Sequence, residues 1–404
     1  MNGALAVFGA GDPLFGGGVH WVELLIVVVK VVVAFAVLLV SVMLMIWFER
    51  KIISDMQVRI GPNRAGPWGL LQTLADGTKL FFKEDLLPEK ADPTVFRLAP
   101  YLALLPAFLA FAIVPVGGDV TVFGHHFELQ VADPPVGILF LLAMSGVSVY
   151  GVMLAGWSSG SKYPLLGSVR ASAQMISYEA AMGLSVVTVV LIAGTLSTRG
   201  IIAAQSTTFF TSWNIVRTGI VPFLLFMMAV TAELQRPPFD LAEADSELVG
   251  GFNTEYASLR FALFYLAEFM NVITMSAVAV TLFLGGPDGP TAHVFLLSWL
   301  IPVAWFLGKT LIFLFVYVWL RAALPRLRYD QLMDLGWKVL IPLSLGWVLL
   351  VAAGVVGGWW GVGVFGVGLV AFGLLVRAVM VGRARNEESG AVAGVVSDRG
   401  PVVP

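Results

Sequence analysis

The chain has 404 residues, of which 58% are hydrophobic and only 12% are charged, and its formal net charge is −2. A charged fraction about half that of typical soluble domains excludes a soluble globular protein. The absence of cysteine excludes disulfides, cysteine-ligated iron–sulfur clusters and thiol catalysis within this chain. No basic stripe indicates binding to nucleic acid.

Long apolar runs recur along the chain, and a run of about 20 residues can cross a bilayer. They predict eight spans, at 22–48, 98–117, 136–156, 173–196, 214–234, 262–285, 294–319 and 337–357, and a ninth at 359–381. We therefore expect an all-α polytopic membrane protein. Residues 1–358 would form the transmembrane domain, 359–382 an additional C-terminal helix and 383–404 a disordered cytoplasmic tail.

The distribution of lysine and arginine predicts the orientation, because cytoplasmic loops carry an excess of these residues. They concentrate in the segments 49–97, 157–172, 235–261 and 320–338, whereas the opposite loops contain only Arg199 and Arg217. The N-terminus is therefore expected outside, and the loops 49–97 and 235–261 in the cytoplasm. A ninth span would place the C-terminal tail in the cytoplasm as well.

A first polar block interrupts the apolar sequence from Glu49 to Asp85. Gly61-Pro62-Asn63 predicts a turn within it. Between residues 69 and 82, apolar residues alternate with charged ones, and Asp76, Lys79 and Lys83 have the spacing of one helix face. This pattern predicts an amphipathic helix lying along the membrane surface. A helix that only anchors the chain to anionic lipid is the alternative.

A second polar block runs from Glu233 to Tyr256, and Pro237-Pro238 must interrupt the helix that precedes it. Its loop carries the carboxylates Asp240, Glu243, Asp245, Glu247 and Glu255. If 240–248 is helical, Asp240, Glu243 and Glu247 share a face and Asp245 points elsewhere. Because neighbouring carboxylates repel one another, some would keep protons near neutral pH and could pass them on. A solvated acidic loop is the alternative.

Charged residues also occur inside the predicted spans, at Glu179, Glu268, Lys30 and Lys309. An intramembrane carboxylate usually faces a protein interior or a hydrated cavity, whereas a lysine can also extend its side chain to the interface. The four histidines, at positions 20, 125, 126 and 293, fall on one side of the membrane or at its margin. We therefore expect no metal or haem site within this chain.

Three long stretches carry a family resemblance. They contain ERK and QxRxGPNxxGxxGLLQxxADxxKLxxKE at 49–84, AGWSSGSKYPLLGSVRASAQMISYE at 155–179, and AELQRPPFDLAEADSELVGGFNTEYASLRFALFYLAE at 232–268. In this order and spacing they resemble the quinone-site membrane subunit of respiratory complex I, the proton-pumping NADH:quinone oxidoreductase. Asp245 departs from the pattern, because many members carry glutamate there. The ninth span is additional to the family's usual eight.

The resemblance implies a division of roles between this chain and its partners. FMN and iron–sulfur clusters belong to peripheral-arm subunits, and antiporter-like subunits continue the membrane arm. This chain would have no redox centre and no cofactor of its own, with menaquinone or ubiquinone as substrate, in a bacterial plasma membrane. The quinone entrance and chamber would use Glu49, Arg50, Arg59, Asp76, Lys79 and Arg236. Proton coupling would use Glu179, Glu233, Asp240, Glu243, Asp245, Glu247, Glu255 and Glu268.

Two other functions remain open at the level of sequence. The membrane subunit of an energy-converting hydrogenase shares some of these motifs, but the full-length first block, including GPNRAGPWG, favours the quinone-linked complex. A stand-alone cation/proton transporter predicts inverted repeats with broken helices in both halves of the chain. The sequence contains only one proline-broken acidic segment, which argues against a transporter.

Overall fold

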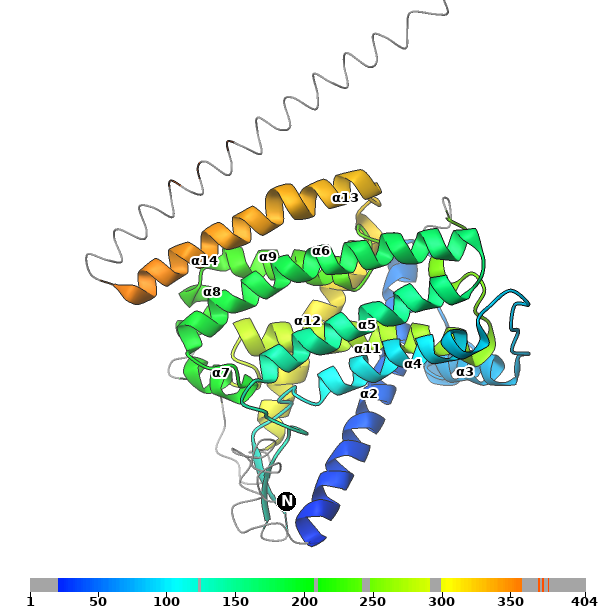
Figure 1. The fold of residues 1–404 in the computed structure, drawn as a ribbon. Helices are drawn as coiled ribbons and strands as arrows, with labels where there is room; N and C mark the ends of the chain where they lie inside the picture. The colour runs from blue at the N-terminus through cyan, green and yellow to red at the C-terminus, as the bar shows by residue number, and fades with distance from the viewer. Residues whose placement is uncertain are drawn as a thin grey trace, which may run out of the picture.

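The structure is a computed structural model. It describes residues 21–122, 125–206, 210–241, 248–290 and 299–357, with three isolated positions beyond them. The predicted ninth span and C-terminal tail lie outside these continuous ranges. The part of the chain that is described folds as a bundle of helices with one short hairpin (Figure 1).

The helices alternate in direction, so that two ends of the bundle can be distinguished. The long helices are α2 (Trp21–Met56), α4 (Pro93–Phe111), α5 (Gly137–Ser158), α6 (Lys162–Ala193), α11 (Ser258–Phe283), α12 (Leu300–Ala323) and the continuous run of α13 (Tyr329–Leu335), the π-helix η4 (Gly336–Leu340) and α14 (Ile341–Val356). The short elements are η2 (Pro67–Gly69), α3 (Gln72–Phe82), β1 (Asp119–Val122), β2 (His125–Glu128), α7 (Thr198–Gln205), α8 (Asn214–Arg217), α9 (Ile220–Glu233) and η3 (Gly251–Asn253). We call the end that holds α3 and η3 the polar end.

Seven of these helices are long and apolar enough to cross a membrane, which agrees with the predicted all-α polytopic class. The predicted fifth span is α9, which has only 14 residues and ends at Glu233. A helix of this length is too short to cross a bilayer unaided. The first helix is longer than its predicted span, because α2 continues to Met56 and carries Glu49 and Arg50 into the polar end.

Burial separates the helices into an outer and a central group. In the most apolar 18-residue stretch of α2, only 11% of the residues are buried inside the bundle. In the corresponding stretch of α11, 83% are buried. The side chains that α11 packs inward include small or hydroxylated ones, such as Thr274, Ser276 and Ala277, among larger apolar ones. Small residues let helix backbones approach closely where no water is displaced between them. The sequence of α11 therefore suits the centre of the bundle, and that of α2 suits contact with lipid.

Helices α4, α5 and α6 pack especially closely. A Cβ added to Gly151 would lie 2.6 Å from the backbone nitrogen of Ala103, and one at Gly156 would lie 2.1 Å from the Ser168 hydroxyl. Neither position tolerates a larger residue without movement of a neighbouring helix. Asp92 caps α4 by accepting hydrogen bonds from the amides of Thr94 and Val95, which fixes where this helix begins.

The opposite end of the bundle contains elements that the sequence pattern did not predict. Strands β1 and β2 form an antiparallel hairpin with Asp119 opposite Glu128, and the buried Glu128 pairs with Arg199 of α7. Lys309 lies here too, and its Nζ donates to the carbonyls of Leu284, Gly286 and Asp288 at 2.7 to 3.0 Å. Lys309 therefore caps the end of α11 instead of extending to the membrane surface.

Candidate functional site

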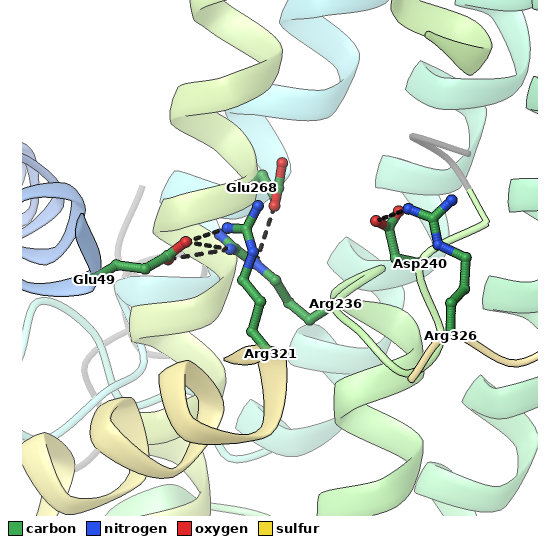
Figure 2. A network of polar contacts seen from close by, with 6 residues as sticks. All are labelled: Glu49, Arg236, Asp240, Glu268, Arg321 and Arg326. Carbon is green, nitrogen blue, oxygen red and sulfur yellow. Dashed lines mark hydrogen bonds and ion pairs between the residues drawn. The ribbon is translucent and has the colours of Figure 1, made fainter. Parts of the chain in front are cut away.

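The centre of the polar end is a buried cluster of charges around Arg236. Its guanidinium lies 3.1 Å from Oε2 of Glu49 and 3.0 Å from Oε1 of Glu268 (Figure 2). It also packs 4.5 Å from the ring centre of Phe269. Arg236 is 4% exposed and Glu49 is 6% exposed. An arginine keeps its charge in proteins, so its burial here depends on these two carboxylates.

Arg321, in the last turn of α12, also pairs with Glu49 (Figure 2). The cluster therefore joins α2, α11, α12 and the loop after α9. The sequence pattern singled out Glu49, Arg236 and Glu268 as site residues but indicated Arg321 only as a loop charge. A basic residue at the end of an apolar helix is common, so its position alone could not have identified it.

The loop that follows Arg236 is anchored on two sides. Asp240 is buried and pairs with Arg326 at 2.9 Å (Figure 2). The backbone amide of Leu327 donates to the Pro238 carbonyl. From the other side, the side-chain amide of Gln174 donates to the backbone carbonyls of Ala232 and Phe239, both at 2.6 Å. Asp240 is not helical, so the predicted helix over 240–248 does not begin there.

The remaining carboxylates of the acidic loop are only partly placed. Glu243, Asp245 and Glu247 lie outside the described residues. Glu255 is partly exposed between η3 and α11. Next to it, burial raises the pKa of the Tyr256 phenol to about 12, so this hydroxyl stays protonated and donates to the Phe96 carbonyl.

A pocket opens beside the charged cluster and is lined by both Glu233 and Glu268. Its volume is about 500 Å³ including the opening, and its other polar lining residues include Ser148, Gln235 and Asn271. The apolar lining comes from α4, α5, α6, η3 and α11 and from Leu234 after α9. Carboxyl and amide groups thus line part of an otherwise apolar cavity in the interior of the bundle.

Glu233 and Glu179 approach the same turn of α5 from two neighbouring helices. The buried Glu233 accepts a hydrogen bond from the Ser145 hydroxyl. Glu179 of α6 faces Gly146, where an added Cβ would lie 3.5 Å from its Oε1. Glu268, Glu233 and Glu179 therefore form a series that runs from the charged cluster through the pocket to α6.

The first polar block contributes a second, more exposed pair. Arg50 lies 2.6 Å from Asp76 of α3, and the Gln72 amide also donates to Asp76. Glu49 and Arg50 are consecutive in α2, so one faces the buried cluster and the other faces α3. Lys79 is exposed, and Arg59 is exposed with a hydrogen bond to Gln57. The structure does not bring these two predicted residues to the cluster.

Helix α3 lies where the amphipathic helix was predicted, but it ends at Phe82. Lys83 has an extended backbone and so does not continue the helical face of Asp76 and Lys79. Across the part of the chain that the structure describes, no group of three or more His, Cys, Asp or Glu side chains could hold a metal ion.

Together these features define a polytopic α-helical membrane protein with a buried charged cluster and a carboxylate-lined pocket at one end. The family described as NADH dehydrogenase matches residues 29–352 of the chain. The H subunit of NADH-quinone oxidoreductase from Frankia casuarinae is 53% identical over 350 residues, 85% of this chain and 75% of that protein. The corresponding proteins of Frankia alni and Streptomyces avermitilis, which carry the same name, are 54% and 48% identical, over 84% of this chain and 74% of each relative.

The chain therefore belongs to the NADH dehydrogenase family, as a membrane subunit of an NADH-quinone oxidoreductase.

Replacing Arg236 with methionine should destabilise the chain strongly. The change leaves Glu49 and Glu268 without their shared cation, and breaking a buried ion pair costs roughly 3 kcal/mol or more. We expect a lower thermal denaturation midpoint of this chain in the purified complex. Lys338→Met is the matched control, because it removes an exposed pair with Asp334, which is worth about 1 kcal/mol at most. Equal midpoints for the two variants would contradict the central role of Arg236.

Proposed function

We propose that this chain forms the entrance and much of the chamber for quinone and that it couples quinone reduction to proton translocation. The observation that carries the proposal is a series of charged groups that extends from the polar end into the bundle. It begins at Asp76 and Arg50 on α3 and α2, passes through Glu49, Arg236 and Glu268, and reaches Glu233 and Glu179 inside the bundle. Quinone chemistry at one end could thus change the charge state at the other.

The quinone would enter beside α3. This helix exposes Leu74, Phe81 and Phe82, which suit an isoprenoid tail, while Arg50 and Asp76 offer polar groups to a quinone head. Binding sites for small molecules commonly combine apolar walls with a few well-placed polar groups. Electrons would arrive from FMN and iron–sulfur clusters in peripheral-arm subunits, and antiporter-like subunits would receive the coupling signal.

Replacing Asp76 with asparagine should lower NADH:quinone activity about tenfold, because the variant loses a charge-assisted contact worth roughly 1.5 kcal/mol. NADH oxidation by ferricyanide, which bypasses quinone, should be unchanged in the same membranes. Asp330→Asn, an exposed carboxylate on α13, is the matched control and should leave both activities unchanged. Equal loss of both activities in the Asp76 variant would point to failed assembly instead of a quinone site.

The acidic loop would take part in coupling through exchange of charge among its carboxylates. Glu243, Asp245, Glu247 and Asp240 would act with the buried Glu233, so single changes can be compensated by neighbours. The double change Glu243→Gln with Glu247→Gln should therefore reduce proton pumping far more than the sum of the two single changes. The measurement is NADH-driven acidification of inverted vesicles, scaled to the amount of assembled complex. Normal pumping by the double variant would leave the loop with a docking role only.

The polar end would face the cytoplasm of a bacterial cell and contact the peripheral arm, with the N-terminus outside. The lysine and arginine distribution supports this orientation. Because the chain has no cysteine, single cysteines report it cleanly. Cysteine at Ser206, on the opposite end, should react with an impermeant maleimide in intact cells, and cysteine at Arg64 should react only in inverted vesicles. A cysteine in the C-terminal tail should behave like that at Arg64. Reaction of the tail cysteine from outside would contradict the predicted ninth span.

A further inference from the structure

Ser258 begins α11 in a backbone conformation that residues other than glycine rarely adopt. Its φ is +56° and its side chain is buried, with 3% of the residue exposed. Its hydroxyl lies 2.9 Å from the Leu80 carbonyl and 2.8 Å from the Lys83 carbonyl, at the end of α3. A non-glycine residue persists in such a conformation only where its surroundings hold it there. Here the side chain reaches carbonyls that belong to the first polar block.

Helix α3 depends on contacts of this kind. It buries none of its own residues, so little apolar packing fixes its position. Its beginning is tied to α2, because Thr73 donates to the Met43 carbonyl and Asp76 pairs with Arg50. The Leu80 carbonyl is among the last four of the helix, which have no partner within it. Ser258 satisfies this carbonyl and so ties the end of α3 to α11.

Arg260 forms a second tie to the same region. It pairs with Asp85 at 2.8 Å and lies 5.4 Å from the ring centre of Phe96. Phe96 in turn stacks on Tyr256 with ring centres 4.0 Å apart and an interplanar angle of 2°. Aromatic stacking and burial hold the Phe96–Tyr256 pair in place. Arg260 thus connects the segment after α3 to a rigid part of the bundle.

We propose that Ser258 and Arg260 form a clamp that positions α3 and thereby sets the affinity of the quinone entrance. The proposal rests on the proposed function in that α3 borders the entrance. With its beginning tied to α2 and its end tied to α11, α3 spans both helices at the polar end. Loosening the clamp would let the end of α3 move, and the apolar residues Phe81 and Phe82 would lose their defined place beside the entrance.

Hydrogen exchange in the assembled complex tests the clamp without reference to quinone. Ser258→Gly removes the hydroxyl while accepting the positive φ, so the variant is expected to fold even where Ser258→Ala does not. Losing a hydrogen bond should speed exchange of amides in residues 72–85 about fivefold. Ser206→Ala, an exposed serine at the opposite end, is the matched control. Unchanged exchange in the Ser258→Gly variant would overturn the clamp.

Arg260 is tested by a double-mutant cycle with Asp85. Arg260→Gln and Asp85→Asn should each loosen residues 72–85, and the double variant should be no looser than either single variant, because both remove the same pair. Arg217→Gln, an exposed arginine on the opposite end, should have no effect on this segment. Simple addition of the two single effects would show that Arg260 does not act through Asp85.

Steady-state kinetics connect the clamp to quinone. In Ser258→Gly, the KM for a long-tailed quinone should rise about fivefold, in proportion to the hydrogen bond lost, with kcat unchanged at saturation. An unchanged KM with faster exchange would overturn the positioning role. The Asp76→Asn variant separates this outcome from failure of the proposed function. If that variant retains full quinone activity while Ser258→Gly still loosens α3, the entrance lies elsewhere and the clamp is structural only.

Discussion

The buried guanidinium of Arg236 constrains the whole polar end of this molecule. An arginine cannot shed its charge to escape a buried site, and an uncompensated buried charge is strongly destabilising. Two carboxylates from different helices must therefore come within contact distance, which they do at Glu49 and Glu268. Arg321 then balances the second oxygen of Glu49. The relative positions of α2, α11 and α12 follow from this requirement.

The remaining charges extend from this fixed centre in two directions. Through Arg50, the residue after Glu49, the centre connects to Asp76 and α3. Through Glu268, it connects to a pocket that also contains Glu233. Arginines provide charges that do not change, whereas carboxylates in such surroundings can gain or lose a proton. This combination suits a site where a change of charge at the entrance alters proton occupancy deeper in the bundle.

The packing of the apolar helices fixes the positions of these charged residues relative to one another. Helix α11 is the most buried span and carries Glu268 directly, so movement of Glu268 would require repacking against α4 and α12. Close contacts such as Gly151 against Ala103 leave little room for such repacking. At the opposite end, Lys309 holds the turn that follows α11 through the carbonyls of Leu284, Gly286 and Asp288. Among the described helices, the closely packed spans thus contrast with α3, which buries none of its own residues.

Much of this could be predicted from local sequence. Apolar runs predicted the polytopic helical class, and the spacing of Asp76 and Lys79 predicted α3. The motifs that carry the family resemblance singled out Glu49, Arg236 and Glu268, which the structure brings together around Arg236. Local patterns succeed here because spans and amphipathic helices depend on residues close together in the chain.

What only the tertiary structure decided is which charges meet. Arg236 and Glu49 are separated by 187 positions, Arg321 and Glu49 by 272, and Ser258 and Leu80 by 178. Nothing in the spacing of these residues distinguishes Arg321 from other loop cations, or marks Ser258 as the partner of α3. Such pairs form only when helices distant in sequence pack side by side. A buried charge or carbonyl needs a partner to offset its loss of hydration, and the packing of the helices decides which residue is close enough to be that partner.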